Sequence, residues 1–112
     1  MGWIVHHAII VTSYRKLDID RAYEQAQAIF PAVSPPIEST VNGYWSFLIP
    51  PDGSKEGWPS SDEGDEERQR FAQWVADESA SLTVVEIAYG EIEQPVVVRV
   101  DGKDTQKQYK GI

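Results

Sequence analysis

The 112-residue chain contains no cysteine, one methionine and only two histidines. The absence of thiols excludes a disulfide framework, a thiolate metal site and a cysteine nucleophile. Basic residues are also few, because 10 Lys and Arg stand against 18 Asp and Glu and leave a net charge of −8. Lys and Arg supply most of the affinity for nucleic acids and for anionic membrane surfaces, so neither is an expected partner.

Sequence motifs that mark common enzymes are missing as well. The chain has no Walker or Rossmann glycine motif and no G-x-S-x-G elbow. No apolar run approaches the roughly 20 residues of a transmembrane helix. The apolar N-terminal stretch lacks the basic region and the small-residue cleavage site of a signal peptide. We therefore expect a cytoplasmic protein without a cofactor, and catalysis is not the favoured interpretation.

Apolar periodicity predicts the order of helices and strands in what we expect, from the chain length, to be one domain. The expected elements are a strand over 3–12, a helix over 18–30, strands over 37–41 and 44–49, a helix over 60–78, and strands over 82–89 and 96–100. Asn42-Gly43 predicts a two-residue type I′ turn between the middle strands. Asp18 and Ser60 are the expected N-caps of the two helices.

The order β-α-β-β-α-β, followed by one extra strand, is typical of the ferredoxin-like fold, in which both helices cover one face of an antiparallel sheet. We expect residues 1–102 to form this α+β domain and residues 103–112 to form a polar tail. Adjacent residues of a strand point to opposite faces. We therefore expect His7 to face the core together with Ile9, in a hydrogen-bonded structural role, and His6 to face the open side.

The most unusual segment runs from residue 52 to residue 67 and carries seven acidic residues against one lysine. It begins as a loop rich in Gly, Pro and Ser and continues into the second helix. A large aromatic residue in such a loop either packs down or contacts a partner. A solvated connector is one interpretation, and a recognition element for a basic protein surface is the other. The residues expected to bind this partner are Asp52, Lys55, Glu56, Trp58, Asp62, Glu63 and Asp65.

The same segment partly matches a calcium-binding loop. Asp52, Ser54, Glu56, Gly57 and Glu63 fall at its positions 1, 3, 5, 6 and 12, where oxygen ligands and one glycine are required. Ser54 and Glu56 depart from the consensus, and a strand rather than a helix precedes the segment. A true EF-hand is excluded on these grounds, and a protein without a metal site is the favoured interpretation.

The open face of the sheet is expected to combine polar and apolar side chains. Its polar members are expected to be His6, Tyr44, Ser46, Glu86 and Arg99. Such a face suits either a dimer interface or a shallow ligand site. We favour a homodimer through this face, and the alternative is a small-molecule-binding protein or enzyme that uses these five residues.

The run PDGSKEGWPSSDEGDEERQRF and the opening WIVHHAIIVTS resemble small uncharacterised proteins encoded by bacteriophages. The resemblance covers roughly a third of the chain and transfers no known activity. It implies a small accessory protein that acts by binding, as acidic phage proteins do when they occupy basic surfaces of host proteins. The leading expectation is therefore a small acidic binding protein that engages a protein partner through residues 52–67.

Overall fold

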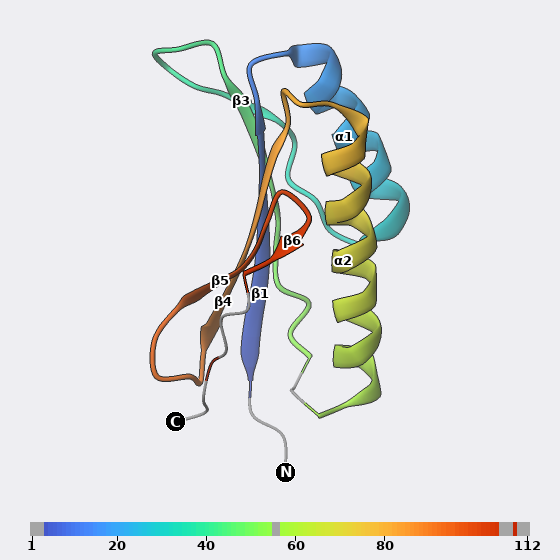
Figure 1. Cartoon of the computed structure of the whole chain (residues 1–112), viewed down its shortest axis with the longest axis vertical. Coiled ribbons are helices and arrows are strands. Elements are labelled where there is room, and N and C mark those ends of the chain that lie inside the picture. The colour runs from blue at the N-terminus through green and yellow to red at the C-terminus, as the bar shows by residue number, and fades with distance from the viewer. Residues whose placement is uncertain (1–3, 55–56, 106–108, 110–112) are drawn as a thin grey trace.

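The computed structural model describes residues 4–54, 57–105 and 109 (Figure 1). Its elements are β1 (Val5–Ser13), α1 (Lys16–Ile29), β2 (Ile37–Glu38), β3 (Trp45–Ile49), α2 (Pro59–Glu78), β4 (Thr83–Gly90), β5 (Val96–Val100) and β6 (Lys103–Asp104). Every predicted helix and strand is present, although β2 is shorter than predicted. Strand β6 lies in the region predicted as a tail.

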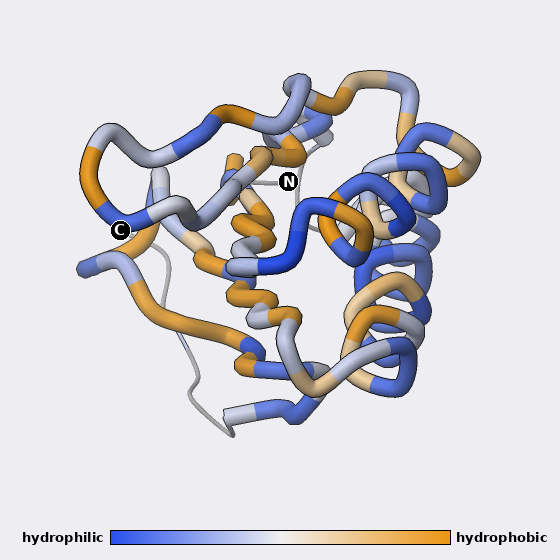
Figure 2. The backbone as a smooth tube through the Cα atoms, turned by 90° about the horizontal axis from the view of Figure 1, so that it is seen from above, coloured by the Kyte–Doolittle hydropathy of each residue, from blue (hydrophilic) through white to orange (hydrophobic). Residues whose placement is uncertain are grey.

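The strands form one antiparallel sheet in the order β2-β3-β1-β4-β5-β6. Helices α1 and α2 lie side by side on one face of this sheet, and no described element covers the other face (Figure 1). Seen from above, the strands are largely apolar and the outer sides of the helices are largely hydrophilic (Figure 2). The predicted α+β architecture with an antiparallel sheet is confirmed.

The main core lies between the helices and the sheet, where alternate residues of the strands point inward. Ile9 and Val11 of β1 and Phe47 of β3 pack there against α1 and against Phe71 of α2. His7 shares the inward face of β1 and is buried, whereas His6 on the other face is half-buried. The predicted orientation of β1 is therefore confirmed.

The predicted two-residue turn at Asn42-Gly43 is wrong. A type I′ turn needs a positive φ at both central residues, but of these two only Gly43 has one, at 75°. The Ser39 hydroxyl instead accepts the N–H groups of residues 41 and 42. These side-chain bonds compete with strand pairing. The loop is consequently longer. Ile37 lies opposite Ser46, whereas a two-residue turn would have paired it with Leu48.

Both helices begin one or two residues earlier than predicted. Helix α2 starts at Pro59, with Trp58 in the N-cap position and no side-chain capping bond. Proline suits the first helical position because its φ is already helical and that residue needs no N–H partner. Asp18 lies inside α1, where its carboxylate accepts the hydroxyls of Ser79 and Ser81, at 2.7 and 2.6 Å. It therefore joins the start of α1 to the segment that follows α2.

Candidate functional site

Among the described residues, the most deeply buried charged side chain is Glu86, in the middle of β4, with 1% of its surface exposed. Its carboxylate accepts a hydrogen bond from His7 Nδ1 at 3.0 Å and one from Arg68 Nε at 3.3 Å, and it also pairs with Arg99 Nη1. We call His7, Arg68, Glu86 and Arg99 the ionic cluster. Strands β1, β4 and β5 and helix α2 each contribute one member, so the cluster ties both halves of the chain together.

The predicted position of Glu86 and Arg99 on the open face is wrong, because both point toward the helices. On β4, Val84 and Ala88 are buried on the same side as Glu86. A register shift after Glu86 then sets Arg99 directly opposite it on β5. A carboxylate can be buried there because it has cationic and hydrogen-bonding partners, which a buried charge requires.

The cluster keeps Glu86 ionised. Burial alone raises the pKa of a carboxyl group, but the hydrogen bond from His7 and the charges of Arg99 and Arg68 outweigh it, so the pKa of Glu86 lies below its ordinary value. An ionised carboxylate only accepts hydrogen bonds, so the Nδ1 atom of His7 carries the proton. The other ring nitrogen, Nε2, lies 3.4 Å from the Tyr109 hydroxyl. His7 thus has the structural, hydrogen-bonded role that we predicted.

A pocket of about 280 Å³ opens beside the ionic cluster, and we call it the α2 pocket. The pocket is lined by residues 30–32 after α1, by residues 49–52 at and after the end of β3, and by one side of α2 that includes Arg68. His7 of β1 also contributes to its wall. Apart from Asp52, the lining is therefore apolar along the two connecting segments, and it is charged along α2. The pocket lies on the helix side of the sheet, not on the open face.

Gly64 of α2 allows two charged groups to approach the helix at this pocket. A Cβ atom at this position would lie 3.1 Å from both Asp52 Oδ2 and Arg68 Nη1. The other oxygen of Asp52 accepts the N–H and the hydroxyl of Ser54, at 2.8 and 2.7 Å. Burial raises the pKa of Asp52, but the hydrogen bonds from Ser54 and the charge of Arg68 together lower it by more, so the net shift of the pKa is downward. Asp52 is thus a fixed, ionised group on the pocket wall.

The first half of α2 presents a row of carboxylates. Asp62, Glu63 and Glu66 are exposed and Glu67 is half-buried, and we call these four residues the acidic face. In the part of the chain that the structure describes, no ion pair neutralises any of them. Asp65 differs, because it pairs with Arg68. Glu63 and Glu67 also line the α2 pocket.

The remaining residues predicted to bind a partner are Lys55, Glu56 and Trp58. Trp58 immediately precedes α2 and is 49% exposed. Lys55 and Glu56 lie outside the described residues.

Among the residues described, no three His, Asp or Glu side chains are grouped so that they could hold a metal ion. Nor does any described helix combine the length and apolar character that crossing a membrane requires.

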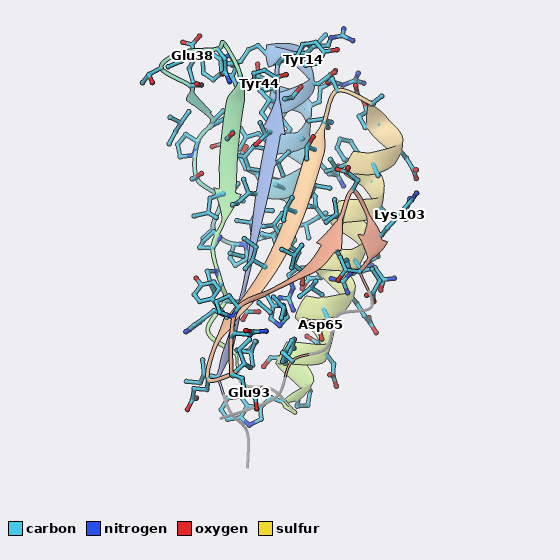
Figure 3. The ribbon with its side chains drawn as sticks, turned by 60° about the vertical axis from the view of Figure 1, so that its left-hand side comes forward. Tyr14, Glu38, Tyr44, Asp65, Glu93 and Lys103 are labelled. Carbon is cyan, nitrogen blue, oxygen red and sulfur yellow. The ribbon has the colours of Figure 1, made fainter. Side chains whose placement is uncertain are left out.

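The residues predicted on the open face do not converge. His6 packs against Tyr89 near the start of β1, with ring centroids 5.2 Å apart. Tyr44 packs against Tyr14 beyond the other end of that strand, with centroids 5.9 Å apart. Tyr14 lies eight residue steps along the chain from His6, which corresponds to about 26 Å for extended strand. Figure 3 shows Tyr14 and Tyr44 together at the end of the sheet away from Asp65.

Ser46 is the one remaining member of the predicted open-face set, and its hydroxyl bonds to that of Thr12 at 2.8 Å. The five predicted residues therefore occupy both faces and both ends of the sheet, and one ligand cannot contact all of them. Exposed apolar side chains on the open face include Ile10 and Leu48. Self-association through this face stays a prediction.

No protein-family model, curated protein or solved structure matches this chain. The predicted site residues did not include Gly64, Glu66, Glu67 or Arg68, which belong to the acidic face, the α2 pocket or the ionic cluster. A usable signal existed for Arg68, because it lies three residues before Phe71 and seven before Val75, on the buried stripe of the helix. An arginine on such a stripe requires a buried acid as its partner.

The depressed carboxylate pKa values predict how stability changes with pH. Hydrogen bonds from Ser81 and Ser79 lower the pKa of Asp18, and those of Asp52 and Glu86 are also lowered. A lowered folded-state pKa means that the unfolded chain takes up protons first, so these groups stabilise the fold fully above their unfolded pKa values of about 4.

We therefore expect the stability of the protein to fall as the pH drops below about 4 and to keep falling toward the lower folded-state pKa values. The urea midpoint, measured at a series of pH values, reports this loss. In Asp18→Asn the curve should be shallower than in the wild type, because one of the responsible groups no longer titrates. Parallel curves for the two proteins would exclude Asp18 as a contributor.

Proposed function

We propose that this chain is a non-catalytic binding protein that engages a basic surface of a protein partner through the acidic face and the adjoining residues 52–58. The observation that carries the proposal is the row of four carboxylates on α2 without a basic partner among the described residues. The bacteriophage resemblance supports an accessory role of this kind.

The acidic face is unfavourable for the helix on its own. Asp62 with Glu66, and Glu63 with Glu67, are like charges spaced four residues apart, and each such pair costs about 0.2–0.5 kcal/mol. The helix dipole favours acids only in the first turn, which contains Asp62 and not Glu66 or Glu67. A partner with Lys and Arg side chains would remove this repulsion on binding.

The acidic face also has a rigid base, which favours recognition. The opposite side of α2 holds Phe71, Ala72 and Val75, all fully or almost fully buried. The carboxylates therefore project from a helix fixed to the core, so little conformational entropy is lost when they bind. Charges arranged in this way also accelerate association with a basic partner.

Neutralising part of the acidic face should weaken binding and slightly stabilise the fold. The double variant Glu63→Gln/Glu66→Gln removes one charge from each like-charge pair. It leaves Asp62, which interacts favourably with the helix dipole. We expect the Kd for a 12-residue peptide of alternating Arg and Gly to rise by about tenfold in 0.15 M salt. We also expect the free energy of unfolding to increase by about 0.4–1 kcal/mol.

The matched control is Glu24→Gln/Glu93→Gln, which removes the same charge from exposed positions on α1 and on the β4–β5 connection. If both double variants weaken the peptide equally, the peptide responds only to net charge and the proposal fails. Fluorescence anisotropy gives the affinities, and urea denaturation of the same samples gives the stabilities.

We further propose that the domain is an extended ferredoxin-like fold. The strand order β2-β3-β1-β4 supports this, because each β-α-β connection spans one intervening strand, as in the split βαβ arrangement. Strands β5 and β6 then continue the sheet beyond β4. The first, acidic half of α2 directly follows the segment that leaves β3, and the α2 pocket is lined by both.

A further inference from the structure

We propose that the α2 pocket receives a single Arg or Lys side chain of the protein partner. This inference rests on the proposed function and makes it more specific. Three carboxylates face the pocket, with Glu63 and Glu67 on α2 and Asp52 on the loop that follows β3. Apolar residues from 30–32 and 49–51 form the rest of its wall.

This combination matches the two parts of a basic side chain. The methylene stem of Arg or Lys packs on apolar surface while its charged group remains among polar groups. Carboxylates form charge-assisted hydrogen bonds with that charged group. A volume of about 280 Å³ suits one side chain, because pockets for drug-sized ligands start at roughly 300 Å³.

An anionic occupant is disfavoured, although Arg68 lines the pocket. Its guanidinium donates to Glu86 through Nε and to Asp65 through Nη2, and it also lowers the pKa of Asp52. With 6% of its surface exposed, Arg68 is held within the ionic cluster. The carboxylates of Asp52, Glu63 and Glu67 would repel an anion that entered the pocket.

The pocket is also preorganised. Asp52 is fixed by two hydrogen bonds from Ser54, and Glu63 and Glu67 project from successive turns of one helix. Gly64, between them, leaves space that a Cβ atom would fill. A site whose charged groups are already ordered loses less entropy when it binds.

The first experiment titrates the full chain with N-acetyl-arginine methylamide and follows the backbone amides by NMR. We expect Gly64 and Ile49 to shift. The neutral isostere N-acetyl-citrulline methylamide should shift them much less, and N-acetyl-glutamate methylamide should not shift them. Equal shifts with the arginine and citrulline probes, or stronger shifts with the glutamate probe, would overturn the inference.

The second experiment separates the pocket from the rest of the acidic face, using the Arg-Gly peptide as the probe. Glu63→Gln/Glu67→Gln removes two pocket carboxylates, and Asp62→Asn/Glu66→Gln removes two from the same helix outside the pocket lining. We expect the first pair to raise the Kd by at least about tenfold and the second pair by about threefold or less. Equal effects would refute the pocket and leave the proposed function standing, whereas a wild-type chain that does not bind the peptide would refute both.

A third variant tests the pocket without changing charge. Ala32→Trp adds a large side chain at an exposed position on the pocket wall, and Ala80→Trp adds the same group at an exposed position outside it. Only the first should weaken peptide binding, with the thermal midpoint of both variants close to that of the wild type. If the two variants bind the peptide equally well, the side chain does not enter the pocket.

Discussion

Replacing Glu86 by glutamine is expected to destabilise the protein by about 3–5 kcal/mol, which is the usual cost of removing one partner from a buried ion pair. The substitution keeps the shape of the side chain but removes its charge. Arg68 and Arg99 then face each other across a neutral amide, and both remain buried or nearly buried. Urea denaturation at pH 7 measures the loss.

The size of the effect follows from the burial of the cluster. Because Glu86 is only 1% exposed, water cannot take over the hydrogen bonds that the carboxylate accepted. In glutamine an NH2 group replaces one of the two carboxylate oxygens. Its N–H groups then face N–H donors of the ionic cluster, which bonded to that oxygen before. Because whole domains are stable by only about 5–15 kcal/mol, this single change removes a large part of the total.

Glu93→Gln is the matched control, because it makes the same chemical change at an exposed position in the turn after β4. We expect its stability to remain within about 0.5 kcal/mol of the wild type. A loss below about 1 kcal/mol for Glu86→Gln would mean that solvent reaches the cluster and that it does not hold the strands to α2. An altered dependence on urea concentration would instead indicate a change in the denatured state.

The helices, the strands and the inward face of β1 could be predicted because each follows from a local period. Alternation along β3 places Phe47 and Ile49 on the same face, and both are almost completely buried. Helical spacing groups Phe71 and Val75 on the buried side of α2 in the same way. These signals are local, because the repeat of apolar residues within one strand or helix marks the residues that share its buried side.

The orientation of β4 could not be predicted in this way, because both of its faces are apolar. Val84 and Ala88 accompany Glu86 on one face, while Val85 and Ile87 lie on the other. With the hydrophobic signal balanced, the position of Glu86 depends on its partners. His7 is 79 residues away in the sequence and Arg68 is 18 residues away, so no local pattern reveals these contacts.

The candidate site was predicted in part for the same reason. The charge of residues 52–67 is visible in the sequence, but the pocket exists only because the connections after α1 and β3 meet α2. Glu63 and Asp52 were predicted as separate members of an acidic segment. The structure places both in the lining of one pocket, with the Asp52 carboxylate close to Gly64.

Phe71→Ala is expected to cost about 3–5 kcal/mol, because a fully buried aromatic side chain would be replaced by a cavity. Phe71 is 0% exposed and contacts Phe30 edge-to-face, with ring centroids 5.6 Å apart. Phe30 also lines the α2 pocket. The cavity would therefore remove the support of the pocket wall and detach α2 from the core.

Two comparisons distinguish the loss of packing from a general effect on α2. Phe71→Leu should lose less than Phe71→Ala, because leucine fills most of the space. Trp58→Ala, at the exposed start of the helix, should leave the thermal midpoint nearly unchanged. If Phe71→Ala lost less than about 1 kcal/mol by urea denaturation, the sheet and α1 would form the core without α2. The acidic face would then lack the rigid base on which its proposed role in recognition depends.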